Sequence, residues 1–92
     1  MSYVTVSADF PSVTTEQRKK IYECIKEKGW TKVIEPGRDI DTVWYAQFTD
    51  AASEQGCINT TKADFVDCSK PYCNPKLVMQ WGPNKPAFHG LV

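Results

Sequence analysis

Polar and apolar residues alternate along three short stretches of the chain, which is typical of strands that bury one face. These stretches are Tyr3–Phe10, Val43–Phe48 and Pro75–Trp81. In the first of them, Val4 and Phe10 fall on one face, while Tyr3 and Asp9 fall on the other. A fourth stretch, Trp30–Glu35, also has strand-forming residues and is closed by a Pro-Gly pair. The pattern therefore predicts four strands.

A helix is predicted between the first two strands. Thr14 and Gln17 have the spacing of a capping box, in which each side chain satisfies a free amide of the first turn. Ile21 and Ile25 then recur at helical spacing, and Gly29 suits the left-handed conformation that ends many helices.

A second helix is expected after the third strand, capped by Thr49 or Asp50 and beginning with Ala51-Ala52-Ser53-Glu54. Gly56 and the polar residues that follow weaken it. Residues 63–67 could finish the helix or form a short extra strand, and we expect a frayed helix that gives way to a loop before Pro71. A polar loop is expected at residues 38–41, between the second and third strands.

The resulting order β-α-β-β-α-β predicts an α+β, ferredoxin-like fold, a four-stranded antiparallel sheet with two helices on one face. A chain of 92 residues has room for one core. We therefore expect a single domain over residues 1–92, with a core at about 2–82 and a tail over 83–92.

This fold leaves one sheet face uncovered. The outward residues expected there are half apolar: Tyr3, Thr5, Ser7, Asp9, Val43, Tyr45, Val78 and Gln80. An uncovered apolar patch favours a partner. One interpretation is a homodimer formed by sheet packing; another is a platform on which Tyr3 and Tyr45 stack RNA bases, although the glycine-aromatic signatures of an RNA-recognition motif are missing.

Asp9 is the candidate for catalysis. A carboxylate at the end of the first strand can hold a divalent cation such as magnesium or act as a general base in phosphodiester cleavage, and two such residues across a dimer would make a two-carboxylate site. An Asp next to a Pro-Ser turn also commonly bonds local amides. The sequence leaves both roles open, and it indicates no organic cofactor.

Charge narrows the choice of partner. Eleven basic and eleven acidic residues cancel, so any site for a polyanion must be local. The first helix and the residues just after it carry six of the basic residues, which makes Arg18, Lys19 and Lys20 candidate phosphate contacts, with Arg38 a further one. The apolar runs are far shorter than the roughly 20 residues that span a bilayer, and the opening residues lack a signal peptide, so we expect a cytoplasmic protein without membrane contact.

Four cysteines allow two interpretations, disulfides or a zinc site: Cys24, Cys57, Cys68 and Cys73. A reducing compartment argues against disulfides, and the spacing lacks the close pairs of a zinc site. Cys24 falls on the apolar side of the first helix and is expected to be a small core residue. His89 has no visible partner in the sequence.

Three segments resemble the GhoS family of antitoxins: residues 3–12, the helix end Lys28-Gly-Trp30, and Thr49–Glu54. Members of that family are similar in fold to CRISPR-associated nucleases. The resemblance implies a ferredoxin-like endoribonuclease that cuts the messenger RNA of a small membrane toxin, with Asp9 at the acidic position. The basic position that the family uses in its first helix matches Tyr22 here, which weighs against cleavage and leaves RNA binding intact.

The leading hypothesis is thus a homodimeric RNA-binding protein of antitoxin type, with metal-assisted cleavage of single-stranded RNA as its enzymatic form. The alternative is a non-enzymatic inhibitor or adaptor that binds a protein target through the open sheet face.

Overall fold

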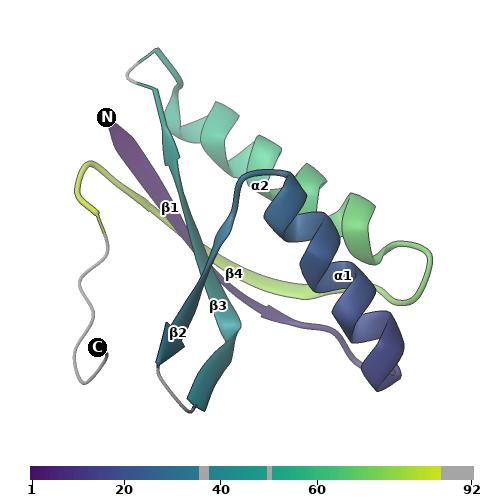
Figure 1. Ribbon diagram of the computed structural model, residues 1–92. Coiled ribbons are helices and arrows are strands. Elements are labelled where there is room, and N and C mark those ends of the chain that lie inside the picture. Colours follow the sequence, from purple (N-terminus) through teal and green to yellow (C-terminus); the bar gives the residue numbers. More distant parts are fainter. Residues whose placement is uncertain (36–37, 50, 86–92) are drawn as a thin grey trace.

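The chain forms one antiparallel sheet with both helices on the same side (Figure 1). The computed structural model describes residues 1–35, 38–49 and 51–85, without the side chains of residues 34–35 and 38–42. Its elements are β1 (Ser2–Asp9), α1 (Thr15–Glu27), β2 (Thr31–Glu35), β3 (Arg38–Phe48), α2 (Glu54–Ser69) and β4 (Lys76–Gly82). The sheet order β2-β3-β1-β4 confirms the ferredoxin-like arrangement.

β1 is a central strand, paired antiparallel with β3 on one side and β4 on the other. Its even-numbered residues lie beneath the helices, and Val4 and Val6 are fully buried there. Ser7 and Asp9, on the other face, are exposed. The strand stops at a turn in which Ser12 adopts a φ of 61°. The predicted register of this strand is confirmed.

Both helices form, and α1 does so as predicted. Thr14 Oγ1 accepts a hydrogen bond from the Gln17 N–H, and the side-chain oxygen Oε1 of Gln17 accepts one from the Thr14 N–H. The chain leaves the helix through Gly29, whose φ of 97° is in the left-handed region that favours glycine. Local signals were sufficient here because capping depends on residues only three apart.

The prediction for α2 was wrong at its start, whereas the helix ends before Pro71 as expected. The N-cap is Ser53, whose Oγ accepts the Gly56 N–H, while Thr49 closes a preceding turn and Asp50 lies outside the described residues. The helix is continuous to Ser69 without the expected fraying, and two of its buried hydroxyls donate to carbonyl oxygens one turn earlier. Thr61 bonds the Cys57 carbonyl oxygen at 2.7 Å, and Ser69 bonds that of Phe65 at 2.8 Å.

Residues 38–41 were expected to form a loop, and they belong to β3 instead. Glu35 pairs with Arg38 and Ile34 with Asp39, and a register irregularity separates these pairs from the next one at Lys32. Backbone hydrogen bonds to β2 do not depend on whether the side chains are polar, so the strand continues through this run of polar residues. Pro36 and Gly37, at the expected turn, lie outside the described residues.

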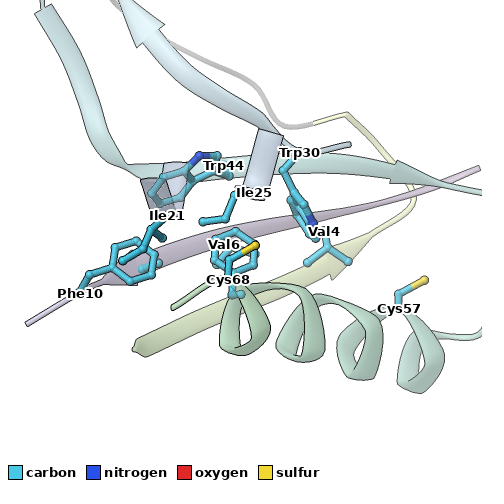
Figure 2. Close-up of a cluster of buried hydrophobic side chains, with 11 residues drawn as sticks. Val4, Val6, Phe10, Ile21, Ile25, Trp30, Trp44, Cys57 and Cys68 are labelled. Atoms are coloured by element: carbon cyan, nitrogen blue, oxygen red, sulfur yellow. The ribbon is translucent and has the colours of Figure 1, made fainter. Parts of the chain in front are cut away.

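The core lies between the sheet and the helices (Figure 2). Trp44 of β3 is at its centre, with ring centroids 6.0 Å from Phe10 and 5.5 Å from Phe65 of α2. The rings meet edge to face, the arrangement that aromatic pairs favour. Each layer of the fold thus contributes to one aromatic cluster.

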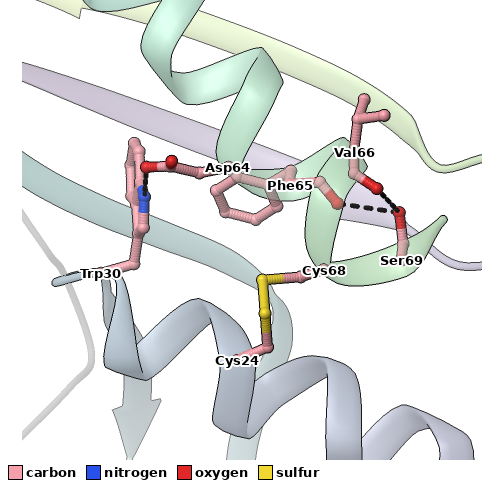
Figure 3. The surroundings of a disulfide bond; sticks show 7 residues. All are labelled: Cys24, Trp30, Asp64, Phe65, Val66, Cys68 and Ser69. Carbon is pink, nitrogen blue, oxygen red and sulfur yellow. Dashed lines mark hydrogen bonds between the residues drawn. A yellow bond between two sulfur atoms is a disulfide. The ribbon is translucent and has the colours of Figure 1, made fainter. Parts of the chain in front are cut away.

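A disulfide joins the two helices, between Cys24 of α1 and Cys68 of α2 (Figure 3). The expectation against disulfides was therefore wrong, although Cys24 does pack against the core as expected. The two cysteines are 44 residues apart in sequence, so no spacing signal reveals the pair. Packing both helices on the same sheet face brings their Cα atoms to 5.6 Å, within the range that a disulfide spans. Cys57 and Cys73 are free thiols.

Within the described residues, neither helix has the length and apolar character needed to cross a lipid bilayer.

Removing the disulfide should lower the stability of the domain. The bond closes a long loop, and such cross-links typically contribute about 2–4 kcal/mol, in large part by restricting the unfolded chain. We expect the double variant Cys24→Ala/Cys68→Ala to lose about this much unfolding free energy in urea titrations followed by circular dichroism. Cys73→Ala, which removes a free thiol, should change the free energy by less than about 1 kcal/mol. Equal stability of the double variant and wild type in non-reducing buffer would contradict the structural role of the bond.

Candidate nucleic-acid interface

A groove of about 730 Å³ runs between α1 and the adjacent part of the sheet. We call it the α1 groove. Its lining comes from α1, β2, β3 and the residue that precedes β2: Thr15, Arg18, Lys19, Tyr22, Glu23, Lys26, Trp30, Thr31, Lys32 and Trp44. The groove lies on the helix side of the sheet, so it is separate from the open face on which the sequence analysis placed its RNA platform.

The helical period explains one wall of the α1 groove. Arg18, Tyr22 and Lys26 are four residues apart, so they follow one another along one side of α1. The facing wall comes from a strand pair: Lys32 of β2 is the register partner of Trp44 of β3. A helix and a hairpin edge that are distant in sequence thus present basic and aromatic groups to the same space.

The apolar wall is built around Tyr22. Its ring lies 5.3 Å from that of Trp44, edge to face, and Lys32 Nζ is 4.9 Å from the ring centroid. Trp30 and Trp44 are almost fully buried, with 4% and 2% of their surface exposed. The accessible apolar surface therefore comes mainly from the half-buried Tyr22 and from the aliphatic stems of the lysines.

α2 holds the base of the groove in place (Figure 3). Trp30 donates a hydrogen bond from its Nε1 to Asp64 Oδ2 at 3.0 Å, and its ring lies 5.1 Å from that of Phe65. Phe65 also packs against Trp44, as described for the core. The indoles that form the bottom of the α1 groove are thus fixed by one turn of a helix that does not line it.

The lining is strongly cationic. The groove has four basic lining residues and one acidic one, Glu23. The basic residues are Arg18, Lys19, Lys26 and Lys32. Because the whole chain carries no net charge, this positive potential is a local property of the α1 groove. It suits an anionic ligand that also has an apolar or aromatic part.

The structure separates the basic residues that the sequence analysis grouped together. Arg18 and Lys19 line the α1 groove, and Arg18 also contacts the Phe10 carbonyl oxygen at 3.5 Å. Lys20 is exposed and is not part of the lining. Arg38 begins β3, and its side chain lies outside the described part of the structure.

Tyr3 and Tyr45 lie on neighbouring strands of the open face. Tyr3 pairs with Gln47, and Thr5 pairs with Tyr45, so the two tyrosines are diagonal neighbours. Both are half-buried, and Lys85 Nζ lies 5.8 Å from the centroid of the Tyr45 ring. The predicted placement is confirmed, while stacking of RNA bases there stays a prediction.

Asp9 is exposed at the end of β1, where its register partner is Lys76 of β4. It lies near enough to Cys73 to act on that thiol, as does Arg18. Burial raises the pKa of Cys73, the guanidinium of Arg18 opposes the rise, and the carboxylate of Asp9 adds to it. Asp9 directly precedes Phe10, whose carbonyl oxygen the groove residue Arg18 contacts at 3.5 Å, so the end of β1 lies beside Arg18.

The described residues contain no group of three or more His, Cys, Asp or Glu side chains arranged to hold a metal ion. Asp9 alone supplies at most two oxygen ligands, whereas Mg²⁺ takes six and usually binds through one or two carboxylates with several waters. A single chain does not complete such a site with its described residues. The predicted role of Asp9 as a metal ligand stays a prediction.

Sequence reasoning missed Tyr22, Trp30, Lys32 and Trp44 as groove residues. Trp30 was assigned only to a strand and Trp44 to the side of the sheet beneath the helices, and both belong to the core. Tyr22 was noted only as the residue at the basic position of the family that the chain resembles. A signal was present on α1, because Arg18, Tyr22 and Lys26 share one side of the helix. No comparable signal links that side to Lys32, since their proximity depends on how α1 packs on the sheet.

No protein-family model, curated protein or solved structure matches this chain.

The reactivity of Cys73 should report on its two charged neighbours. Because its pKa is raised, iodoacetamide at mildly alkaline pH should modify Cys73 more slowly than a cysteine in a short peptide. Arg18→Gln removes the group that lowers this pKa, so the thiolate fraction and the rate should fall further. Asp9→Asn removes a group that raises the pKa, so the rate should increase. Mass spectrometry of the Cys73 peptide measures both, and unchanged rates would contradict the proximity of the three groups.

Proposed function

We propose that the protein binds single-stranded RNA in the α1 groove. The observation that carries this proposal is that four cationic side chains line the same groove as the half-buried Tyr22. Proteins that bind single strands combine basic groups that hold phosphates with aromatic rings on which bases stack. The α1 groove has both features, on a chain that otherwise has no net charge to attract a polyanion.

The two walls have different roles in this proposal. Lys19 and Lys26 of α1 and Lys32 of β2 hold the phosphates from opposite sides, while Tyr22 packs against a base. Lysines position a backbone without reading its sequence, so the binding depends strongly on salt and weakly on base identity. A cytoplasmic location belongs to the same proposal, because RNA of this kind is found there.

Removing two lysines from the α1 groove should flatten the salt dependence of RNA binding. Each phosphate contact on a single strand contributes about 0.7 to the slope of log K against log salt, so Lys19→Ala/Lys26→Ala should reduce the slope by about 1.4. Fluorescence anisotropy with a labelled oligouridylate at several salt concentrations measures this slope.

The matched control is Lys62→Ala/Lys70→Ala, which removes two exposed lysines at α2 that do not line the α1 groove. It should leave the slope close to that of wild type. Lys20→Ala distinguishes the α1 groove from the helix as a whole, since Lys20 lies outside the lining and should also have little effect. Equal losses in all three variants would show nonspecific attraction, and no loss in any of them would exclude the α1 groove as the RNA site.

Tyr22 should contribute to affinity through stacking. Replacing it with leucine keeps an apolar side chain and removes the ring, so we expect RNA binding to weaken by about 1–3 kcal/mol, the range for one stacked base. Tyr72→Leu, at a half-buried tyrosine outside the α1 groove, is the matched control. Circular dichroism first shows that both variants are folded, and isothermal titration with RNA then measures their affinities. Equal RNA affinities of the two variants would remove Tyr22 from the site.

Cleavage of the bound RNA is a second candidate, supported by the exposed Asp9 directly before Phe10, whose carbonyl oxygen the groove residue Arg18 contacts at 3.5 Å. In this form Asp9 acts as a base or as one ligand of a metal ion, and a homodimer brings in the second carboxylate. Labelled single-stranded RNA should then be cut in the presence of Mg²⁺, and Asp9→Asn should abolish the cut while RNA is still bound. A variant as active as wild type would remove Asp9 from the chemistry.

A further inference from the structure

The disulfide lies on the side of α1 away from the α1 groove. Cys24 follows Tyr22 by two residues, which is a rotation of about 200° around the helix axis. The bond therefore ties α1 to α2 on one side, while the other side of α1 forms a wall of the groove. Any change in how α1 sits against α2 also changes the position of that wall relative to β2.

α2 provides a second connection between the disulfide and the α1 groove. Cys68 lies one turn after Asp64 and Phe65, the residues that hold Trp30 through a hydrogen bond of 3.0 Å and a ring contact of 5.1 Å. Phe65 also contacts Trp44 at 5.5 Å. Figure 3 shows the bond, the Asp64–Trp30 hydrogen bond and Phe65 together. The bond and the indoles at the base of the α1 groove thus share one stretch of α2.

We propose that the Cys24–Cys68 disulfide is a redox control of the α1 groove, holding it in its RNA-binding shape when oxidised. This inference rests on the proposed function and names the regulation of the same site. In a reducing compartment a persistent structural disulfide is unusual, and those that occur are mostly transient or redox-sensing. The half-buried Cys24 gives a thiolate partial access to the bond, whereas Cys68 is buried.

The reaction is thiol–disulfide exchange with a dithiol reductant. A thiolate of the reductant attacks one sulfur of the bond, the S–S bond breaks, and a mixed disulfide forms. The second thiol of the reductant then displaces the protein cysteine. In total, Cys24 and Cys68 gain two electrons and two protons, and the dithiol becomes a disulfide.

The physical consequence follows from what remains after reduction. The helices are then held by packing alone, and the segment that carries Asp64 and Phe65 is no longer tied to α1. A groove whose walls vary in position binds less tightly, because the ligand must then select the competent fraction of the population. Reduction therefore weakens RNA binding without removing a single RNA contact.

The experiment measures the affinity of wild type for a fluorescein-labelled oligouridylate with and without dithiothreitol. Reduction should weaken binding at least about fivefold, the lower end of the coupling found between linked sites. Cys24→Ala/Cys68→Ala should bind like the reduced protein and ignore the reductant. Cys73→Ala, which keeps the bond, should respond as wild type does. Circular dichroism of each sample confirms that the fold is retained.

A ligand-free measurement keeps this inference separate from the proposed function. Hydrogen exchange of the Trp30 indole N–H, followed by NMR on wild type, should accelerate on reduction because its bond to Asp64 opens more often. Faster exchange with no RNA binding in either state would sustain the coupling and reject the proposed function. RNA binding with equal affinity in both states, or unchanged exchange at Trp30, would overturn the coupling.

Discussion

The packing of Phe65 against Trp30 and Trp44 is the contact on which the rest of the structure depends. Phe65 is fully buried on α2, Trp44 lies in a central part of β3, and Trp30 directly precedes β2. These edge-to-face contacts connect the helix layer to the sheet at the point where the α1 groove opens. Core and candidate site are therefore not independent, since the same rings serve both.

A neutral chain can still offer a site to a polyanion if its charges are segregated. Here the helical period gathers Arg18, Lys19 and Lys26 on the side of α1 that faces Lys32. The carboxylates that balance the total charge are distributed elsewhere, with Glu23 as the one acidic residue in the lining. The field that a ligand meets is then set by the lining rather than by the whole molecule.

The two sheet faces offer different chemistry. The helix side has a groove with cationic walls, whereas the open face presents Tyr3, Tyr45 and the exposed Val78. Asp9 lies at the end of β1 on the open face, yet it acts on Cys73 together with the groove residue Arg18. Arg18 also contacts the carbonyl oxygen of Phe10, the residue after Asp9, so a groove residue lies beside this strand end.

The sequence alone determined what depends on short-range order. Strand alternation predicted the faces of β1, and the capping box with Gly29 predicted both ends of α1, because each signal involves residues a few positions apart. It was misleading where strand pairing overrode composition, at the polar start of β3, and where composition underestimated the continuity of α2. Only the tertiary structure decided the disulfide and the α1 groove. Both join segments that are distant along the chain, and only the packing of the helices on one sheet face brings those segments together.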